Sequence, residues 1–389
     1  MADKGKTKDF SKARQELLDK VMTLFNGKTL NWTKGWSQDG VPQAPVSAIT
    51  GSRYRGVNNL VLWLTAMERG YKDNRWLTFN QIEKNGWHFK KDENGNSLGK
   101  GAGVPIELFR YYDKLTKKDV DFKEFGKLTL EEQKEYWKEN VKIILRNHTV
   151  FNADVVDGIP TLETKHISAD ERDDAAEKVI RAWNDKQCKI IHDGGDSAYY
   201  SPKTDDIHLP EKSSFASLED YYGTAAHEIA HSTGHASRLD RDLSGGFGSE
   251  KYAIEELRAE FSSLFIQQEI GLKPSDFHVK NHVAYLQNWG EIIGKDPKVL
   301  FGAVNDAAKI TSFIMDNAAE LQQENAAELE NIADLAATQE GAEEAAAPIS
   351  AGLAAMIGAA PYQPETYAEQ TANVDSPFIR AMLGEDVSE

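Results

Sequence analysis

The pentapeptide His227-Glu228-Ile229-Ala230-His231 combines residue types that together can activate a water molecule. Residues four apart share one face of a helix, so both imidazoles can reach a single metal ion. Glu228 then lies where it can polarise the water bound to that metal. The spacing therefore predicts a zinc hydrolase site with His227 and His231 as ligands and Glu228 as the general base.

A third ligand must come from outside the pentapeptide. The longer zinc motif would place a third histidine at position 237, where this chain has Ser237. His235 is nearer, but the chain would have to turn back sharply onto the metal, so it stays an alternative. The next helical segment, residues 252–270, carries glutamates at positions 255, 256 and 260.

Residues four apart on a helix lie above one another in a column, and the column to which each glutamate belongs predicts whether it is buried. Positions 252, 256, 260 and 264 form a column that looks buried, whereas positions 251, 255, 259 and 263 form one expected to face solvent. Two acids on a buried column repel unless cations compensate them, as a metal and a metal-bound histidine do. We therefore expect Glu256 to be the third ligand and Glu260 to accept the outer N–H of His227. Glu255 stays open as a ligand, and a charged helix face with Arg258 is the structural alternative.

The segment before the pentapeptide predicts a short hairpin. Residues 198–202 and 207–210 flank a polar turn. Metallopeptidases bind substrate backbone along such a strand edge, which is a form of strand addition. Tyr199 or Tyr200 could donate to a developing oxyanion, with ordinary strand packing as the alternative for each.

Composition bounds the organisation of the chain. A length of 389 residues predicts two domains and a tail. Cys188 is the single cysteine, which excludes a disulfide framework and suits a reducing cytoplasm. Because the start lacks a leader pattern and no apolar run reaches membrane length, we expect a soluble cytoplasmic protein with no membrane partner.

Charge differs between the two halves. Residues 1–150 hold 27 Lys and Arg against 19 Asp and Glu, a net charge of +8, whereas the rest holds 18 against 43, a net charge of −25. Positive potential in one half predicts that the first domain binds an anionic polymer.

The basic half interleaves cations with aromatic residues in segments 51–59, 75–81 and 86–91. Aromatic rings stack on unpaired bases while Arg and Lys neutralise phosphates, so this pattern favours single-stranded DNA over duplex grooves. The expected DNA-binding residues are Arg53, Tyr54, Arg55, Asn58 and Trp76. Trp63 and Leu64 are expected to belong to a helix core instead.

These motifs together resemble the antirestriction ArdC family of mobile elements. The resemblance is carried by GSRYRGVN (51–58), WLTFNQ (76–81), VFN (150–152), HEIAHSTGH (227–235) and ELRAE (256–260), and it runs from about residue 15 to 313. It implies an N-terminal single-stranded-DNA-binding domain, also found on plasmid TraC-type primases, joined to a zincin-like metallopeptidase domain. It further implies a role in shielding or assisting plasmid or phage DNA in a restricting host. Residues 92–97 and 116–140 depart from the family pattern as insertions.

We therefore expect an α+β chain with a DNA-binding domain at 1–158, a zincin-like domain at 159–317 and an acidic tail at 318–389. The tail has a net charge of −13 and is expected to be disordered or partly helical. The functional hypothesis is a peptidase using Zn²⁺, or another divalent metal such as Mn²⁺, on an unidentified protein near DNA. The alternative is a non-catalytic single-strand-binding antirestriction protein with a structural or dormant metal site.

Overall fold

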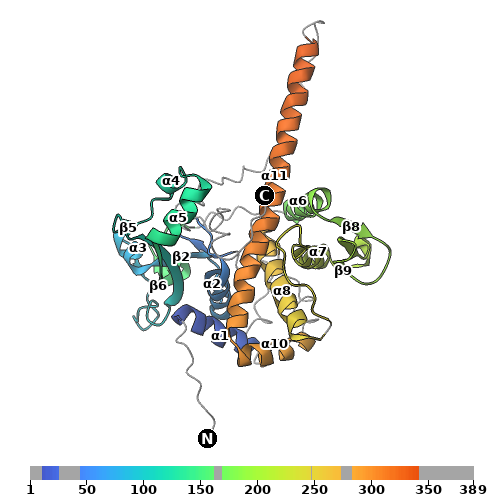
Figure 1. Ribbon diagram of the computed structural model, residues 1–389. Coiled ribbons are helices and arrows are strands. Elements are labelled where there is room, and N and C mark those ends of the chain that lie inside the picture. Colours follow the sequence, from blue (N-terminus) through green and yellow to red (C-terminus); the bar gives the residue numbers. More distant parts are fainter. Residues whose placement is uncertain (1–10, 26–43, 162–168, 247, 273–282, 341–389) are drawn as a thin grey trace.

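The computed structural model describes residues 11–25, 44–161, 169–246, 248–272 and 283–340. Helices and strands are mixed, as expected for an α+β chain, and Figure 1 shows a sheet-containing first half beside a mainly helical second half. The helices are α1 (Lys12–Phe25), α2 (Gly56–Arg69), α3 (Phe79–Lys84), α4 (Phe122–Phe125), α5 (Leu130–Asn140), α6 (Ala169–Lys186), α7 (Leu218–Ser232), α8 (Glu250–Ile270), α10 (Val283–Lys295) and α11 (Lys298–Glu340).

A five-stranded sheet organises the first half, in the order β1-β2-β6-β4-β5. Its strands are β1 (Val46–Ser47), β2 (Arg75–Thr78), β4 (Val104–Asp113), β5 (Lys118–Asp119) and β6 (Val141–Asn152). The pairing of β4 with β6 is a long antiparallel ribbon that runs from Val104 opposite Val150 to Asp113 opposite Val141. Alternate residues at one end of this ribbon are buried against α2, which fixes its register. A separate two-stranded sheet pairs β3 (His88–Phe89) with β7 (Val156–Asp157).

The second half contains a three-stranded sheet next to α7. Its order is β8 (Lys189–His192), β10 (Asp206–Leu209) and β9 (Tyr199–Ser201). The expected hairpin is present, because β9 and β10 pair antiparallel with Tyr200 opposite Ile207. Cys188 is 4% exposed beside this sheet, in agreement with its expected place in the core.

Helices α8 and α11 lie between two hydrophobic cores and contribute residues to both. Leu257 and Phe265 of α8 belong to the first core with α2, whereas Ala259 and Ile266 belong to the second core with α6 and α7. Figure 1 shows α11 running between the two halves and continuing beyond them. A helix buried on two sides has no simple solvent face, which matters for the acids on α8.

Contact between the halves is close at the start of α2. Gly56 has a φ of +51°, and a Cβ there would lie 3.2 Å from Oδ1 of Asn305 on α11. Glycine thus fits both the left-handed backbone and the narrow space. Because the two halves share the first core, the expected boundary near residue 158 does not separate two independent cores.

Two further sequence expectations can be compared with the structure. The insertion at 116–140 contains α4 and α5, which pack Phe125 and Trp137 on Tyr111. The expected tail begins inside α11, where Ala318 is still 5% exposed, and residues 341–389 lie outside the described part. No helix in the described ranges has the length and apolarity needed to cross a membrane.

The shared core predicts that the halves unfold together. Leu300 on α11 is fully buried in the first core, so Leu300→Ala should lower the free energy of unfolding by about 2–5 kcal/mol. Urea unfolding followed by tryptophan fluorescence and far-UV circular dichroism should show one coincident transition in both proteins. Leu115→Ala, at a side chain 66% exposed, is the matched control and should change stability by less than about 0.5 kcal/mol. Two separate transitions in the wild type would contradict the shared core.

Candidate metal centre

Helix α7 presents the pentapeptide, and local sequence fixes its start. The side chain of Ser217 accepts a hydrogen bond from the backbone N–H of Asp220, and acids occupy the first turn. Both features stabilise a helix N-terminus. The apolar side of α7 is buried against α6, α8 and the small sheet, with Tyr221 and Ala225 fully buried. The two histidines are thereby aimed at α8.

The metal-facing nitrogens of both histidines converge on Glu256. Nε2 of His227 and Nε2 of His231 lie 3.0 Å apart. The carboxylate of Glu256 lies 3.5 Å from the first nitrogen and 3.4 Å from the second. Ligand atoms of these three residues all lie within 4.8 Å of one another. Two imidazoles and one carboxylate form a donor set that suits zinc and related divalent metals and leaves a position for water.

The outer nitrogens of the histidines also meet carboxylates. Nδ1 of His227 lies 2.8 Å from Glu260, the partner expected from the sequence. Nδ1 of His231 lies 3.5 Å from Glu255. Carboxylates in this position orient a metal-binding imidazole and fix which nitrogen faces the metal.

The expected exposure of Glu255 is wrong. Glu255 is 6% exposed, because its column is buried from Glu255 through Ala259 to Ser263, and only Lys251 at its start is exposed. The hydroxyl of Ser263 on that column donates to the carbonyl of Gly223 on α7, 2.9 Å away. Because the carboxylate of Glu255 meets the outer nitrogen of His231, it lies on the wrong side of that ring to share its metal.

The alternative ligand His235 lies apart from the convergent group. It follows the end of α7, and its Nδ1 lies 2.8 Å from the hydroxyl of Ser237 and 3.7 Å from Asp205. Glu228, in contrast, is 8% exposed, and its negative charge contributes to the raised pKa of both His227 and His231, so it lies within electrostatic reach of the centre. Its place on α7 fits the expected general base.

Buried acids control the charge of the histidines. Burial alone lowers the pKa of His227, but the charge of Glu260 and hydrogen bonds to Glu256 and Glu260 outweigh it and raise this pKa well above its ordinary value. Burial likewise opposes the charged form of His231, yet hydrogen bonds to Glu255 and Glu256 raise its pKa to about 9. The same contacts hold the pKa of Glu256 well below its ordinary value despite its burial. A metal ion must therefore compete with protons for the nitrogens of these histidines.

The two tyrosines of β9 differ in whether their hydroxyl groups are free to bind a substrate. The hydroxyl of Tyr200 donates to Asp205 at 2.8 Å, so it is committed to the turn after β9. Tyr199 is 46% exposed and stacks on His208 with ring centroids 4.6 Å apart. Strand packing thus explains Tyr200 better than oxyanion binding does.

The expected DNA-binding residues do not gather on an open surface. Arg53 forms an ion pair with Glu269 of α8 at 2.5 Å, and Arg55 donates to Ser312 of α11 at 3.1 Å. Both arginines therefore contact the second half of the chain.

The remaining candidates have structural surroundings. Trp76 is fully buried in the first core, so the expectation that it stacks on a base is corrected. Tyr54 packs against the same core, and burial raises its pKa to about 12. Asn58 exchanges hydrogen bonds with the backbone of Glu107 at 2.6 and 2.8 Å, in the part of β4 that does not pair with β5. The presence of cations and aromatic residues in the sequence alone could not distinguish side chains that contact other parts of the protein from side chains that contact DNA.

The raised histidine pKa values predict pH-dependent metal binding. Below pH 9 the metal-free His231 is protonated, so a metal ion must displace that proton and affinity falls as pH falls. We expect the apparent Kd for Zn²⁺ to rise about tenfold per pH unit for each displaced proton. Calorimetry between pH 6 and 8, in buffers of different ionisation enthalpy, measures affinity and proton release together. A Kd that does not change over this range would contradict the assignment.

Comparison with protein families divides the chain as its motifs do. Residues 11–151 match the N-terminal domain of the anti-restriction factor ArdC. Residues 174–306 match a zincin-like metallopeptidase family. A DNA primase TraC from Escherichia coli is 36% identical over 308 residues, which are 77% of this chain and 27% of that protein. The chain thus spans about a quarter of this primase. An uncharacterized protein y4eC of Sinorhizobium fredii is 29% identical, over 77% of this chain and 90% of its own length.

Solved structures show a likeness that covers both halves of the chain. The Mn(II)-bound crystal structure of the antirestriction protein ArdC from plasmid R388 is 30% identical, with a TM-score of 0.57. The match covers 79% of this chain and 98% of that protein. A metal-free structure of the same protein gives 31% identity and a TM-score of 0.56. With both halves matched in order and nearly all of a solved relative covered, this chain belongs to the ArdC family of antirestriction proteins.

Proposed function

We propose that the chain is a divalent-metal-dependent peptidase whose first half binds single-stranded DNA. The observation that carries the peptidase proposal is the convergence of His227, His231 and Glu256 next to Glu228. Zinc is the proposed metal, and the Mn(II)-bound relative supports manganese as an alternative. The proposed substrate is an unidentified protein met on or near DNA, and the proposed location is the cytoplasm.

The chemistry divides between the metal and the chain. When bound by His227, His231 and Glu256, the metal supplies a Lewis acid that polarises the substrate carbonyl and acidifies water. Glu228 accepts a proton as the water oxygen attacks the carbonyl carbon, and it returns that proton to the amine nitrogen as the C–N bond breaks. Glu260 and Glu255 hold the imidazoles in place through their outer nitrogens.

The free edge of β9 is the proposed site for the substrate backbone. In the three-stranded sheet β9 pairs only with β10, so its other edge is open within the described residues. An extended peptide can add to such an edge with main-chain hydrogen bonds. This placement fits a protein substrate better than a nucleic acid.

Replacement of Glu228 by Gln tests the peptidase proposal. Glu228→Gln should keep the metal, because the ligands are unchanged, but slow cleavage by about 10²-fold or more. Proteomics of host cells that express the wild type or the variant should show cleavage products only with the wild type. Glu219→Gln, at the start of the same helix, is the matched control and should cleave normally. Full antirestriction and unchanged protein fragments in Glu228→Gln would favour the non-catalytic alternative.

The support for single-strand binding comes from the ribbon of β4 and β6. Its exposed apolar side chains are Leu108, Phe109, Ile143 and Leu145, with exposed fractions of 39%, 50%, 44% and 42%. Residues opposite each other in the register share a face, so Leu108, Lys142 and Arg146 lie on one face of the ribbon, and Phe109, Ile143 and Leu145 lie on the other. Lys142 and Arg146 are exposed and form no ion pair with the described residues. The face that carries both cations also holds Leu108 and Tyr112, and such a mixture of cationic and apolar groups suits phosphates and bases. The net charge of +8 over residues 1–150 adds to its positive potential. We therefore propose this face of the ribbon as the DNA contact, instead of Arg53 and Arg55, which contact α8 and α11.

Two variants test the ribbon. Arg146→Ala should lower the slope of log affinity against log salt by roughly 0.7 for one lost phosphate contact. Tyr112→Ala, on the same face as Arg146, should weaken binding of a single-stranded oligonucleotide by about 1–3 kcal/mol if a base stacks on this ring. Lys84→Ala, an exposed cation at the end of α3, is the control and should change neither quantity. Fluorescence anisotropy over a salt series measures both. Preference for duplex, or an unchanged slope in Arg146→Ala, would exclude this surface.

A further inference from the structure

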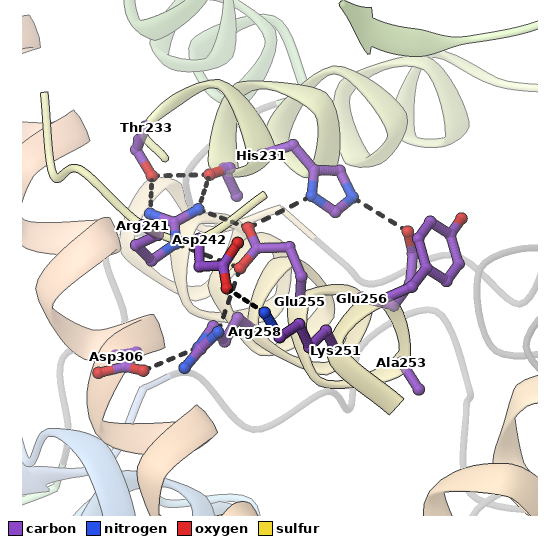
Figure 2. Close-up of polar contacts among 12 residues, drawn as sticks. His231, Thr233, Arg241, Asp242, Lys251, Ala253, Glu255, Glu256, Arg258 and Asp306 are labelled. Atoms are coloured by element: carbon purple, nitrogen blue, oxygen red, sulfur yellow. Dashed lines mark hydrogen bonds and ion pairs between the residues drawn. The ribbon is translucent and has the colours of Figure 1, made fainter. Parts of the chain in front are cut away.

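Arg241 lies in the loop between α7 and α8 and binds both helices. On the α7 side its guanidinium donates to the carbonyl of Ala230 at 2.9 Å and to the hydroxyl of Thr233 at 2.5 Å. On the α8 side it donates to both carboxylate oxygens of Glu255, at 2.6 and 3.2 Å. Figure 2 shows this fork between the end of α7 and Glu255. Arg241 makes these four hydrogen bonds with three nitrogens of its planar guanidinium group, which a lysine ammonium group could not do.

The contacts of Arg241 adjoin the proposed ligands directly. Ala230 precedes His231, and Glu255 precedes Glu256. Two ligands come from α7 and one from α8, so the spacing of these helices decides whether the three ligand atoms meet. The fork joins the helices at the level of the metal centre.

Glu255 itself contacts the centre. Its carboxylate accepts from Arg241 and lies 3.5 Å from the outer nitrogen of His231. Arg258 lies 3.4 Å from the other carboxylate oxygen and pairs with Asp306 of α11 at 2.8 Å. A carboxylate this deeply buried needs such cations, because burial of an uncompensated charge is strongly unfavourable.

The loop that carries Arg241 approaches α8 closely at Gly245. A Cβ at Gly245 would lie 2.6 Å from the backbone nitrogen of Tyr252, so only glycine permits this approach to α8. The side chain of Arg241 is 11% exposed. In contrast, the nearby pair of Lys251 and Asp242 is largely exposed, at 65% and 58%.

From this geometry we infer that Arg241 is a positioning residue for the metal centre. It sets the spacing of α7 and α8 and holds the Glu255 carboxylate against His231. The inference rests on the proposed metal centre, but it does not depend on peptidase activity.

Metal affinity of the full chain tests the inference. Competition between the protein and a chromophoric chelator gives the Kd for Zn²⁺ at fixed pH. Arg241→Met should raise this Kd about 10–100-fold, as loss of a ligand-orienting contact does. Arg241→Lys should also bind zinc more weakly than the wild type, because an ammonium group cannot span the four acceptors.

Arg238→Met is the matched control. Arg238 is in the same loop, its side chain is 2% exposed, and it donates to the carbonyl of Ser232 at 2.7 Å and to Asp205. It contacts no proposed ligand or ligand-orienting acid. Its loss should lower the Tm of the metal-free protein as Arg241→Met does, but leave the zinc Kd within about twofold.

The outcomes are separable. Wild-type zinc affinity in Arg241→Met would overturn the inference, and so would an equal loss of affinity in Arg238→Met, which would show general destabilisation. Full affinity in Arg241→Lys would also overturn it, because charge alone would then suffice. If Arg241→Met does not fold, the comparison of Arg241→Lys with Arg238→Met decides. A wild type that binds neither Zn²⁺ nor Mn²⁺ would instead contradict the proposed function itself.

Discussion

Three carboxylates crowd around two imidazoles where α7 packs on α8, and their mutual repulsion must be overcome for the helices to meet. Glu255 and Glu256 are neighbours on the chain and both are buried. Buried carboxylates are tolerated only beside cations and hydrogen-bond donors. Two arginines supply permanent positive charge on one side, and the histidines supply it, as protons or through a metal, on the other. The packing of α7 on α8 therefore depends on the positive charges that compensate the buried glutamates.

The sequence was sufficient for the parts of the centre that depend on helical spacing. Four-residue spacing predicted that His227 and His231 share a face, and the column of Glu256 and Glu260 predicted which nitrogen each acid meets. The same reasoning failed for Glu255, because it assumed that one side of α8 faces solvent. That side packs on α7, and the loop containing Arg241 covers it. A loop with no periodicity gives no signal for such a contact.

The first half illustrates a different limit. One part of it was predictable: Trp63 and Leu64 lie buried in α2, as expected for the core of a helix. The roles of its cations were not, since Arg53 and Arg55 reach across to α8 and α11. An arginine that pairs within the protein and one that meets a phosphate look alike in a sequence. Which of the two it is depends on tertiary contacts between segments more than 200 residues apart.

Because α8 and α11 contribute residues to both cores, the two halves of the protein depend on each other for folding. A cut between the halves leaves the apolar faces of α2 and α11 without their partners, and exposed faces of that kind aggregate. Replacement of one half by an unrelated sequence would therefore give an insoluble hybrid, unless the new sequence covered the apolar faces of α8 and α11. We therefore expect the two halves to be exchanged between genes as one unit, because each covers apolar surface of the other.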